Sequence, residues 1–147
     1  ALRYVASANR FSRAPSHVAA FSGSTRGTIS QTLRALERKG LVSETRSETD
    51  RRSISYALTE AGREIVDAGR PLDKAVAMLP ADRIPVIEQQ LGDLLRNLLA
   101  ARGGKQFGLC RHCRHHEDRG NAGYCRLLEV DLEPAEKDQI CHEQEPA

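Results

Sequence analysis

The stretch from Gly23 to Gly62 constrains the fold of this chain more than any other part of its 147 residues. It predicts a helix that ends at Gly40, a strand over 41–45, a charged loop tip and a second strand over 53–58. That order of elements is the outline of a DNA-reading helix followed by a β-ribbon wing.

The helix within this stretch has a clear start and a buried face. Thr25 is a suitable N-cap, because its hydroxyl can accept a hydrogen bond from an unpaired backbone N–H of the first turn. Ile29, Leu33 and Leu36 recur at spacings of four and three residues, which is typical of one buried helix face.

A shorter helix is expected immediately before this one. Pro15 suits a first helical turn, and Gly23 is placed to end the helix. Two short helices joined by a turn at Gly23 predict a helix-turn-helix.

The polar face of the second helix and the loop tip carry the side chains that could read DNA. Arginine can pair with guanine, glutamine with adenine, and serine or threonine can reach bases or phosphates. At the loop tip, an arginine could enter the minor groove while a neighbouring carboxylate holds it. Alone, such a helix would be better explained as a solvated face, and such a tip as a charged turn without a partner. Together they favour DNA binding. The candidate residues are Thr25, Arg26, Thr28, Ser30, Gln31 and Arg34 on the helix, with Arg51, Arg52 and the brace Asp50 on the tip.

Charge is distributed unevenly along the chain. Residues 24–52 hold seven basic and four acidic side chains, whereas residues 105–147 hold six basic and nine acidic ones. A basic middle suits contact with phosphates, and an acidic tail would be repelled by them. No apolar run approaches the roughly 20 residues needed to span a bilayer, and no secretion leader is visible, so we expect a cytoplasmic protein.

The motifs over positions 23–62 resemble the multiple-antibiotic-resistance regulator (MarR) family of bacterial winged-helix transcription factors. The motifs that carry the resemblance are Lys39-Gly40-Leu41, Asp50-Arg51-Arg52 and Leu58-Thr59-Glu60-Ala61-Gly62. The resemblance extends more weakly over residues 1–102. It implies an obligate dimer with one winged helix per subunit, with Arg52 as the minor-groove arginine and Asp50 as its brace. It also implies that a small-molecule effector could bind between the wing and the dimerisation helices.

A leucine-rich helix follows the wing. Pro71 predicts a kink or a break after the helix capped by Thr59, and a long helix is expected from Ala81 to about residue 102. Its apolar stripe is either ordinary core packing or a dimer interface, and two-fold symmetry favours a homodimer. The stripe consists of Ile84, Ile87, Leu91, Leu94, Leu95, Leu98 and Leu99.

The last forty residues hold every cysteine of the chain. Cys110 and Cys113 form a C-x2-C pair, and Cys125 and Cys141 follow at wider spacing. Without a secretion signal, this grouping favours a metal over structural disulfides. Four thiolates suit either a tetrahedral zinc ion or a [4Fe–4S] cluster, and the spacing leaves these two nearly level. A redox-active thiol pair, or free thiols in a tail, is the plain alternative.

These features predict a mainly α fold with a small β-ribbon, divided into a winged helix-turn-helix (1–62), a helical dimerisation region (63–104) and a cysteine-rich extension (105–147). We expect a dimeric, sequence-specific transcription regulator, a repressor rather than an activator, with no enzymatic activity. Its metal site would be structural or would sense redox or metal state by changing the dimer geometry through the leucine-rich helix. The competing hypothesis is an iron–sulfur electron-transfer or accessory protein that uses its winged helix for protein contacts.

Overall fold

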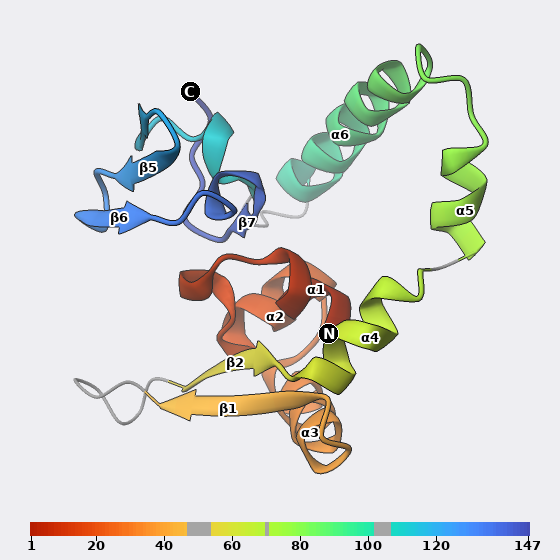
Figure 1. The fold of residues 1–147 in the computed structure, drawn as a ribbon, viewed down its shortest axis with the longest axis vertical. Helices are drawn as coiled ribbons and strands as arrows, with labels where there is room; N and C mark the ends of the chain where they lie inside the picture. The colour runs from red at the N-terminus through yellow and green to blue at the C-terminus, as the bar shows by residue number, and fades with distance from the viewer. Residues whose placement is uncertain (47–53, 70, 102–106) are drawn as a thin grey trace.

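The computed structural model describes residues 1–46, 54–69, 71–101 and 107–147. Its first part is a winged helix body that contains four α-helices, one 3-10 helix and one hairpin (Figure 1). In chain order these are α1 (Leu2–Ser7), η1 (Arg10–Ser12), α2 (Pro15–Ser22), α3 (Arg26–Arg38), β1 (Val42–Arg46), β2 (Ile54–Leu58) and α4 (Glu60–Asp67).

Helix ends in this body are set by the local signals that the sequence contains. Pro15 is the first residue of α2, and Gly23 ends that helix with a φ of 60°, a left-handed conformation that glycine adopts without strain. Thr25 caps α3, since its side chain accepts a hydrogen bond of 3.2 Å from the backbone N–H of Thr28. The predicted helix-turn-helix is confirmed.

The core of the body lies between α1, α2, α3 and the base of the hairpin. Ile29 and Leu33 of α3 are buried in it, as predicted, and Leu36 is half-buried at its edge. Strand β2 pairs with β1 in antiparallel register from Val42↔Leu58 to Arg46↔Ile54. The buried residues that form the core are Tyr4, Val5, Ala8, Val18, Ala19, Ile29, Leu33, Val42 and Tyr56.

Two further helices follow the body. The predicted break near Pro71 is confirmed, because α4 ends at Asp67 and α5 (Pro71–Ala77) begins at the proline. Helix α6 (Ile84–Ala101) starts three residues later than expected from Ala81. Pro85 is its second residue, and proline is tolerated only in the first turn of a helix, which fixes the start at this position.

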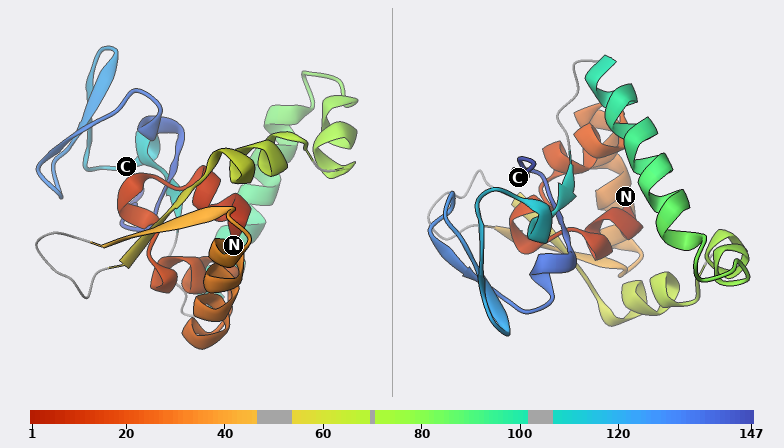
Figure 2. Two further views of the ribbon diagram at one scale, coloured as in Figure 1. Left: turned by 60° about the horizontal axis from the view of Figure 1, so that its bottom comes forward. Right: turned by 90° about the horizontal axis from the view of Figure 1, so that it is seen from above.

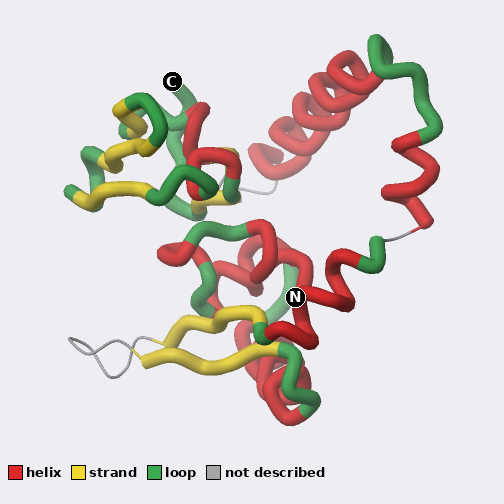
Figure 3. Tube along the Cα trace, in the orientation of Figure 1, coloured by secondary structure: helices red, strands yellow, loops and turns green. Residues whose placement is uncertain are grey.

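The C-terminal part, called here the extension, is rich in short strands, so the prediction of a single β-ribbon was incomplete. Strands β3 (Gly108–Leu109) and β7 (Ile140–Cys141) pair in one sheet. A second sheet has the order β4-β5-β6. The remaining elements are η2 (Cys110–His112), β4 (His116–Arg119), β5 (Ala122–Cys125), β6 (Val130–Leu132) and η3 (Glu136–Asp138). The secondary-structure colouring of Figure 3 separates this β-rich part from the helical body.

The extension lies against α1 and η1 on the side of the body away from α3, as the two views in Figure 2 show together with Figure 1. Helix α4 runs across the predicted domain boundary at residue 62 and packs on the body: a Cβ added at Gly62 would lie 2.0 Å from the carbonyl oxygen of Leu41. Among the described residues, no helix is both long enough and apolar enough to cross a membrane.

Candidate nucleic-acid interface and cysteine cluster

Helix α3 presents the predicted base-reading side chains to solvent. Thr25, Arg26, Thr28, Gln31 and Arg34 are exposed, and Ser30 is half-buried at the margin of the same face. Ile29 and Leu33 hold the opposite face of α3 in the core. The packing of α3 therefore fixes an outward polar and basic surface, called here the α3 face.

The start of α3 is ordered by hydroxyl contacts. The Thr25 and Thr28 hydroxyl oxygens lie 2.9 Å apart and share a hydrogen bond. The Thr32 hydroxyl donates to the Thr28 carbonyl oxygen at 2.9 Å. Gly27 stands beside this pair with open space around it, since a Cβ there would meet only the Thr25 hydroxyl oxygen, at 3.9 Å. Gly27 and the short threonine side chains thus leave the backbone accessible at the first turn of α3.

Glu44 joins α3 to the wing. Its backbone N–H donates to Oε1 of Glu37 on α3 at 3.2 Å, and its own carboxylate accepts from the Tyr56 hydroxyl at 3.1 Å. A hydrogen bond from Arg46, and a second one from Tyr56, hold the pKa of the Glu44 carboxyl below its ordinary value. The base of the wing is therefore tied to the C-terminal end of α3.

The predicted wing-tip residues Asp50, Arg51 and Arg52 lie outside the described residues. Strands β1 and β2 lead to that tip. The roles expected for these three residues stay predictions.

All four cysteines are buried in the extension, and none is in a disulfide. Cys110 opens η2, Cys113 follows it, Cys125 ends β5 and Cys141 ends β7. The sulfur of Cys110 is close enough to the other three for their charges to act on it. Burial, with those neighbouring sulfurs, raises the pKa of the Cys110 thiol to about 12.

Hydrogen bonds to sulfur are a second property of this cluster. The Glu145 backbone N–H donates to Sγ of Cys113 at 3.5 Å. Burial raises the pKa of the Cys141 thiol, and the Asn9 side chain, the Glu143 backbone and the Ser12 side chain act in the opposite direction. Such donors stabilise a thiolate and are typical surroundings of metal-bound cysteine.

The donor set and its surroundings suit zinc or an iron–sulfur cluster chemically, but the side chains are not placed as ligands. Within the described ranges, no group of three or more His, Cys, Asp or Glu side chains is arranged so that it could hold a metal ion. The four-cysteine metal site predicted from the sequence accordingly stays a prediction.

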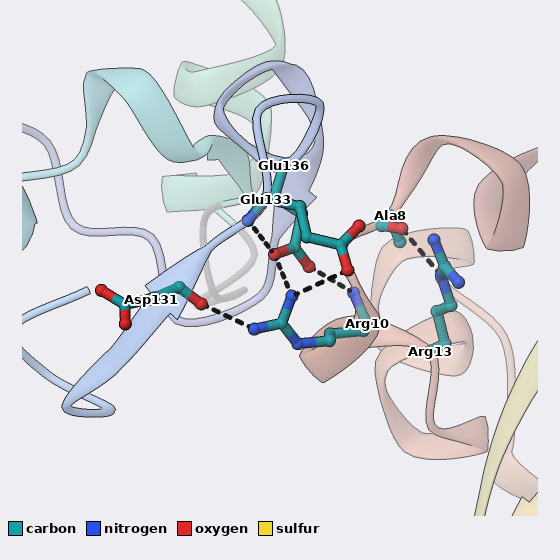
Figure 4. A network of polar contacts seen from close by, with 6 residues as sticks. All are labelled: Ala8, Arg10, Arg13, Asp131, Glu133 and Glu136. Atoms are coloured by element: carbon teal, nitrogen blue, oxygen red, sulfur yellow. Dashed lines mark hydrogen bonds and ion pairs between the residues drawn. The ribbon is translucent and has the colours of Figure 1, made fainter. Parts of the chain in front are cut away.

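Sequence reasoning missed the contact between the body and the extension. Arg10 of η1 forms an ion pair with Glu136 of η3 and donates to the Asp131 carbonyl oxygen at 2.7 Å (Figure 4). The His17 ring of α2 stacks on His142, with ring centroids 3.4 Å apart. On the body side, this contact is made from the run Asn9–Arg13, which is polar apart from Phe11 and carries no pattern that points to a distant partner.

A cavity of about 460 Å³ and another of about 560 Å³ lie beside the extension. The larger one lies between α1, β2 and α4, with Gln139 of the extension in its wall. Two arginines, Arg13 and Arg63, face it together with Asp67. Burial is the main reason why the pKa of Arg13 is lowered. The charge of Glu136 acts in the opposite direction, and the charge of Arg63 lowers the pKa further.

Comparison with known proteins agrees with the geometry of the body. Residues 1–53 match the model of the MarR family. The structure is similar to Streptococcus pneumoniae FabT, solved in complex with DNA, at 28% identity and a TM-score of 0.53 over 68% of this chain and 74% of that chain. It is also similar to the S. aureus MepR–DNA complex, at 24% identity and a TM-score of 0.49 over 66% of this chain and 74% of that one. Curated proteins gave no sequence match.

The family match over residues 1–53 includes the confirmed helix-turn-helix and the motif around Gly40. The likeness to FabT and the motif around Thr59 support the same winged helix. Residues 1–53 are therefore similar to the winged helix-turn-helix of the MarR family.

Proposed function

We propose that this protein is a transcription regulator that binds duplex DNA with the α3 face. The observation that carries the proposal is the outward placement of Arg26, Gln31 and Arg34 on a helix whose other side is anchored in the core. A helix that enters the major groove needs such a rigid, polar and basic surface. The similar protein FabT was solved bound to DNA.

A second copy of this chain is the partner that we propose for α5 and α6. Every residue of these two helices is exposed or half-buried, although many are large and apolar. A contiguous apolar face of this kind marks an interface. A symmetric dimer would also place two α3 helices on paired half-sites. The exposed apolar residues are Leu72, Val76, Met78, Leu79, Val86, Ile87, Leu91, Leu94, Leu95 and Leu98.

The cysteine cluster is proposed as a site for zinc or a [4Fe–4S] cluster that is structural or sensory. Four thiols buried together, with N–H donors at Cys113 and Cys141, are costly to ionise without a cation. Binding a metal ion or cluster would supply that positive charge and would help a short, core-poor segment to fold.

Repression is the direction of regulation that we propose, because a dimer seated on its operator blocks access of other proteins to the same DNA. A small effector has room in the cavity between α1, β2 and α4, where Arg13 and Arg63 would favour an anion. Such an effector would contact α4, which follows the wing directly.

Selection from a pool of random duplexes tests the DNA-binding proposal. The full chain should enrich a sequence with dyad symmetry whose half-sites are centred about one helical turn apart. Gln31→Ala should broaden the base preference at one position per half-site. The exposed residue Gln89 of α6 provides a matched control, and Gln89→Ala should leave the selected sequence unchanged. Recovery of no preferred sequence would contradict sequence-specific binding.

Metal analysis of protein purified without oxygen tests the cysteine site. Bound iron with a broad visible absorption band selects the cluster, and a colourless protein with one zinc per chain selects the ion. Cys110→Ser with Cys113→Ser should abolish either signal. A wild-type protein that holds less than a tenth of an equivalent of both metals would contradict the proposed site.

A further inference from the structure

The extension docks on the winged helix body through the short segment between α1 and α2. Ile140 of β7 forms a parallel bridge with Ala8, and the Asn9 backbone N–H donates to the Ile140 carbonyl oxygen at 3.0 Å. On the other side of Cys141, the His142 backbone N–H donates to the Ser12 hydroxyl oxygen at 2.9 Å. Residues 140–142 are thus held against residues 8–12 on both sides of the cysteine.

Cys141 lies at the centre of this seam, and two side chains of the body reach its sulfur. The polar side chains of Asn9 and Ser12 both lower the pKa of the Cys141 thiol, against the larger effect of burial. Asn9 is 1% exposed and Ser12 is 0% exposed. Buried polar side chains are costly unless they are hydrogen-bonded, and the Ser12 hydroxyl has its partner in the His142 backbone N–H.

Asn9 also carries a cost that packing alone does not explain. Its buried carbonyl oxygen Oδ1 has no hydrogen-bond partner among the described residues. An apolar side chain at this position would avoid the loss that an unpaired buried oxygen brings. The Asn9 side chain thus acts on the Cys141 thiol from a buried position that costs more than an apolar residue would.

The same segment continues directly to the wing. Arg13 follows Ser12, and its carbonyl oxygen accepts a hydrogen bond of 3.2 Å from the Tyr56 backbone N–H of β2. The Arg13 guanidinium Nε donates to the Ala8 carbonyl oxygen at 2.8 Å, which closes the segment on itself. The Tyr4 hydroxyl holds it from α1 by donating to the Ser12 carbonyl oxygen at 2.8 Å.

We propose that Asn9 and Ser12 are positioning residues for Cys141, and that through them the cysteine cluster sets the conformation of the segment that supports wing strand β2. This deepens the proposed function, because it rests on the cluster as the input and the wing as the output. The route runs through residues 8–13, whereas the continuity of the chain had indicated the leucine-rich helix. Every residue of α6 is exposed or half-buried, so α6 offers a poorer mechanical link to the body.

Local opening of the seam can be measured without DNA and without metal. The rate at which iodoacetamide alkylates Cys141 in the intact chain, followed by peptide mass spectrometry, reports how often the seam opens. Ser12→Ala removes the hydrogen bond to the His142 backbone N–H and should raise this rate by at least about fivefold, the factor expected for one lost hydrogen bond. Asn9→Ala removes the second buried polar side chain and should change the rate in the same direction. Cys125 ends β5 and serves as the internal reference, because its rate should stay unchanged.

The link to the wing is read from hydrogen exchange at the Tyr56 amide. Ser12→Ala, Asn9→Ala and Cys141→Ala should each accelerate that exchange, and Ser12→Ala combined with Cys141→Ala should add little beyond either single variant. Ser7→Ala is the matched control for the serine, since Ser7 is exposed on α1, and it should leave Tyr56 exchange unchanged.

Three results would overturn the proposal. Unchanged Cys141 alkylation in both body variants would show that the Asn9 and Ser12 side chains do not hold the cysteine. Equal acceleration at all four cysteines would reduce Asn9 and Ser12 to general structural residues. Faster Cys141 alkylation with unchanged Tyr56 exchange would contradict the proposed coupling between the cysteine and the wing. These readouts stand apart from duplex binding, so failure of the regulator proposal would be seen separately.

Discussion

Arg10 of η1 forms an ion pair with Glu136 of η3, whose side chain is only 5% exposed. Glu136 also accepts a hydrogen bond of 2.9 Å from the Glu133 backbone N–H, so its carboxylate has one partner in the extension and one in the body (Figure 4). Because the Glu136 carboxylate is shielded from solvent, this pair should contribute more than an ion pair that is exposed on both sides.

Arg10→Ala should therefore lower the free energy of unfolding by about 2 kcal/mol, less than for a fully buried pair because the Arg10 side chain is 41% exposed. Urea denaturation measures the difference. Arg63→Ala is the control, since its pair with Glu60 is exposed on both sides and should contribute less than about 1 kcal/mol. Equal losses in the two variants would remove any special role for the Arg10–Glu136 pair.

Gly62→Ala should disrupt the junction between the wing and α4. An alanine Cβ would lie 2.0 Å from the Leu41 carbonyl oxygen, and that oxygen already accepts a hydrogen bond of 3.2 Å from the Thr59 backbone N–H. Relief of the overlap requires α4 to move, which should cost about 3 kcal/mol or prevent folding. Thermal unfolding followed by circular dichroism is the measurement, and a melting temperature within error of wild type would contradict the close approach.

Gly27→Ala should act in opposite directions on stability and on DNA binding. Replacing an exposed helix glycine by alanine should stabilise the free protein by about 0.5–1 kcal/mol. The same methyl group would project from the first turn of α3 and would hinder the close approach of the helix backbone to DNA. Paired measurements of melting temperature and duplex affinity should thus show a rise and a fall. Affinity equal to wild type would place Gly27 away from the DNA.

Acid should weaken the junction between α3 and the wing through Glu44. Because its pKa is lower in the folded state, its stabilising effect is present above the ordinary carboxyl pKa and is lost as the pH falls. Glu44→Gln should therefore lose less stability than wild type between about pH 6 and pH 3. Glu64→Gln removes a charge at an exposed position of α4 and should follow the wild-type profile. Parallel profiles for wild type and Glu44→Gln would remove the proposed role.

The helices and strands of the body could be predicted because their signals are local. Thr25 and Thr59 cap helices through hydrogen bonds to residues three positions ahead, and Gly23 ends a helix through its own conformation. The spacing of Ile29 and Leu33 is enough to choose the buried face of α3. Each of these rules acts within one or two turns of the chain.

The seam between the body and the extension could not be predicted, because no local pattern connects its two sides. Ser12 and His142 are 130 positions apart, and Arg10 and Glu136 are 126 apart. Asn9 and Ser12 read as ordinary turn residues until the fold places Cys141 beside them. The four cysteines were recognised as one group from their spacing, whereas their neighbours in the body depend on how the extension docks.

The most direct test of the account is the affinity of the full chain for a selected duplex as a function of salt concentration. Arg26 and Arg34 on the α3 face should contact DNA, so the logarithm of the affinity should fall steeply and linearly with that of the salt concentration. Arg34→Ala should weaken binding and reduce the slope by about one if Arg34 meets a phosphate. Arg114→Ala, at an exposed arginine of the extension, should leave both values unchanged. Salt-independent binding, or equal effects of the two arginine variants, would contradict DNA reading by α3.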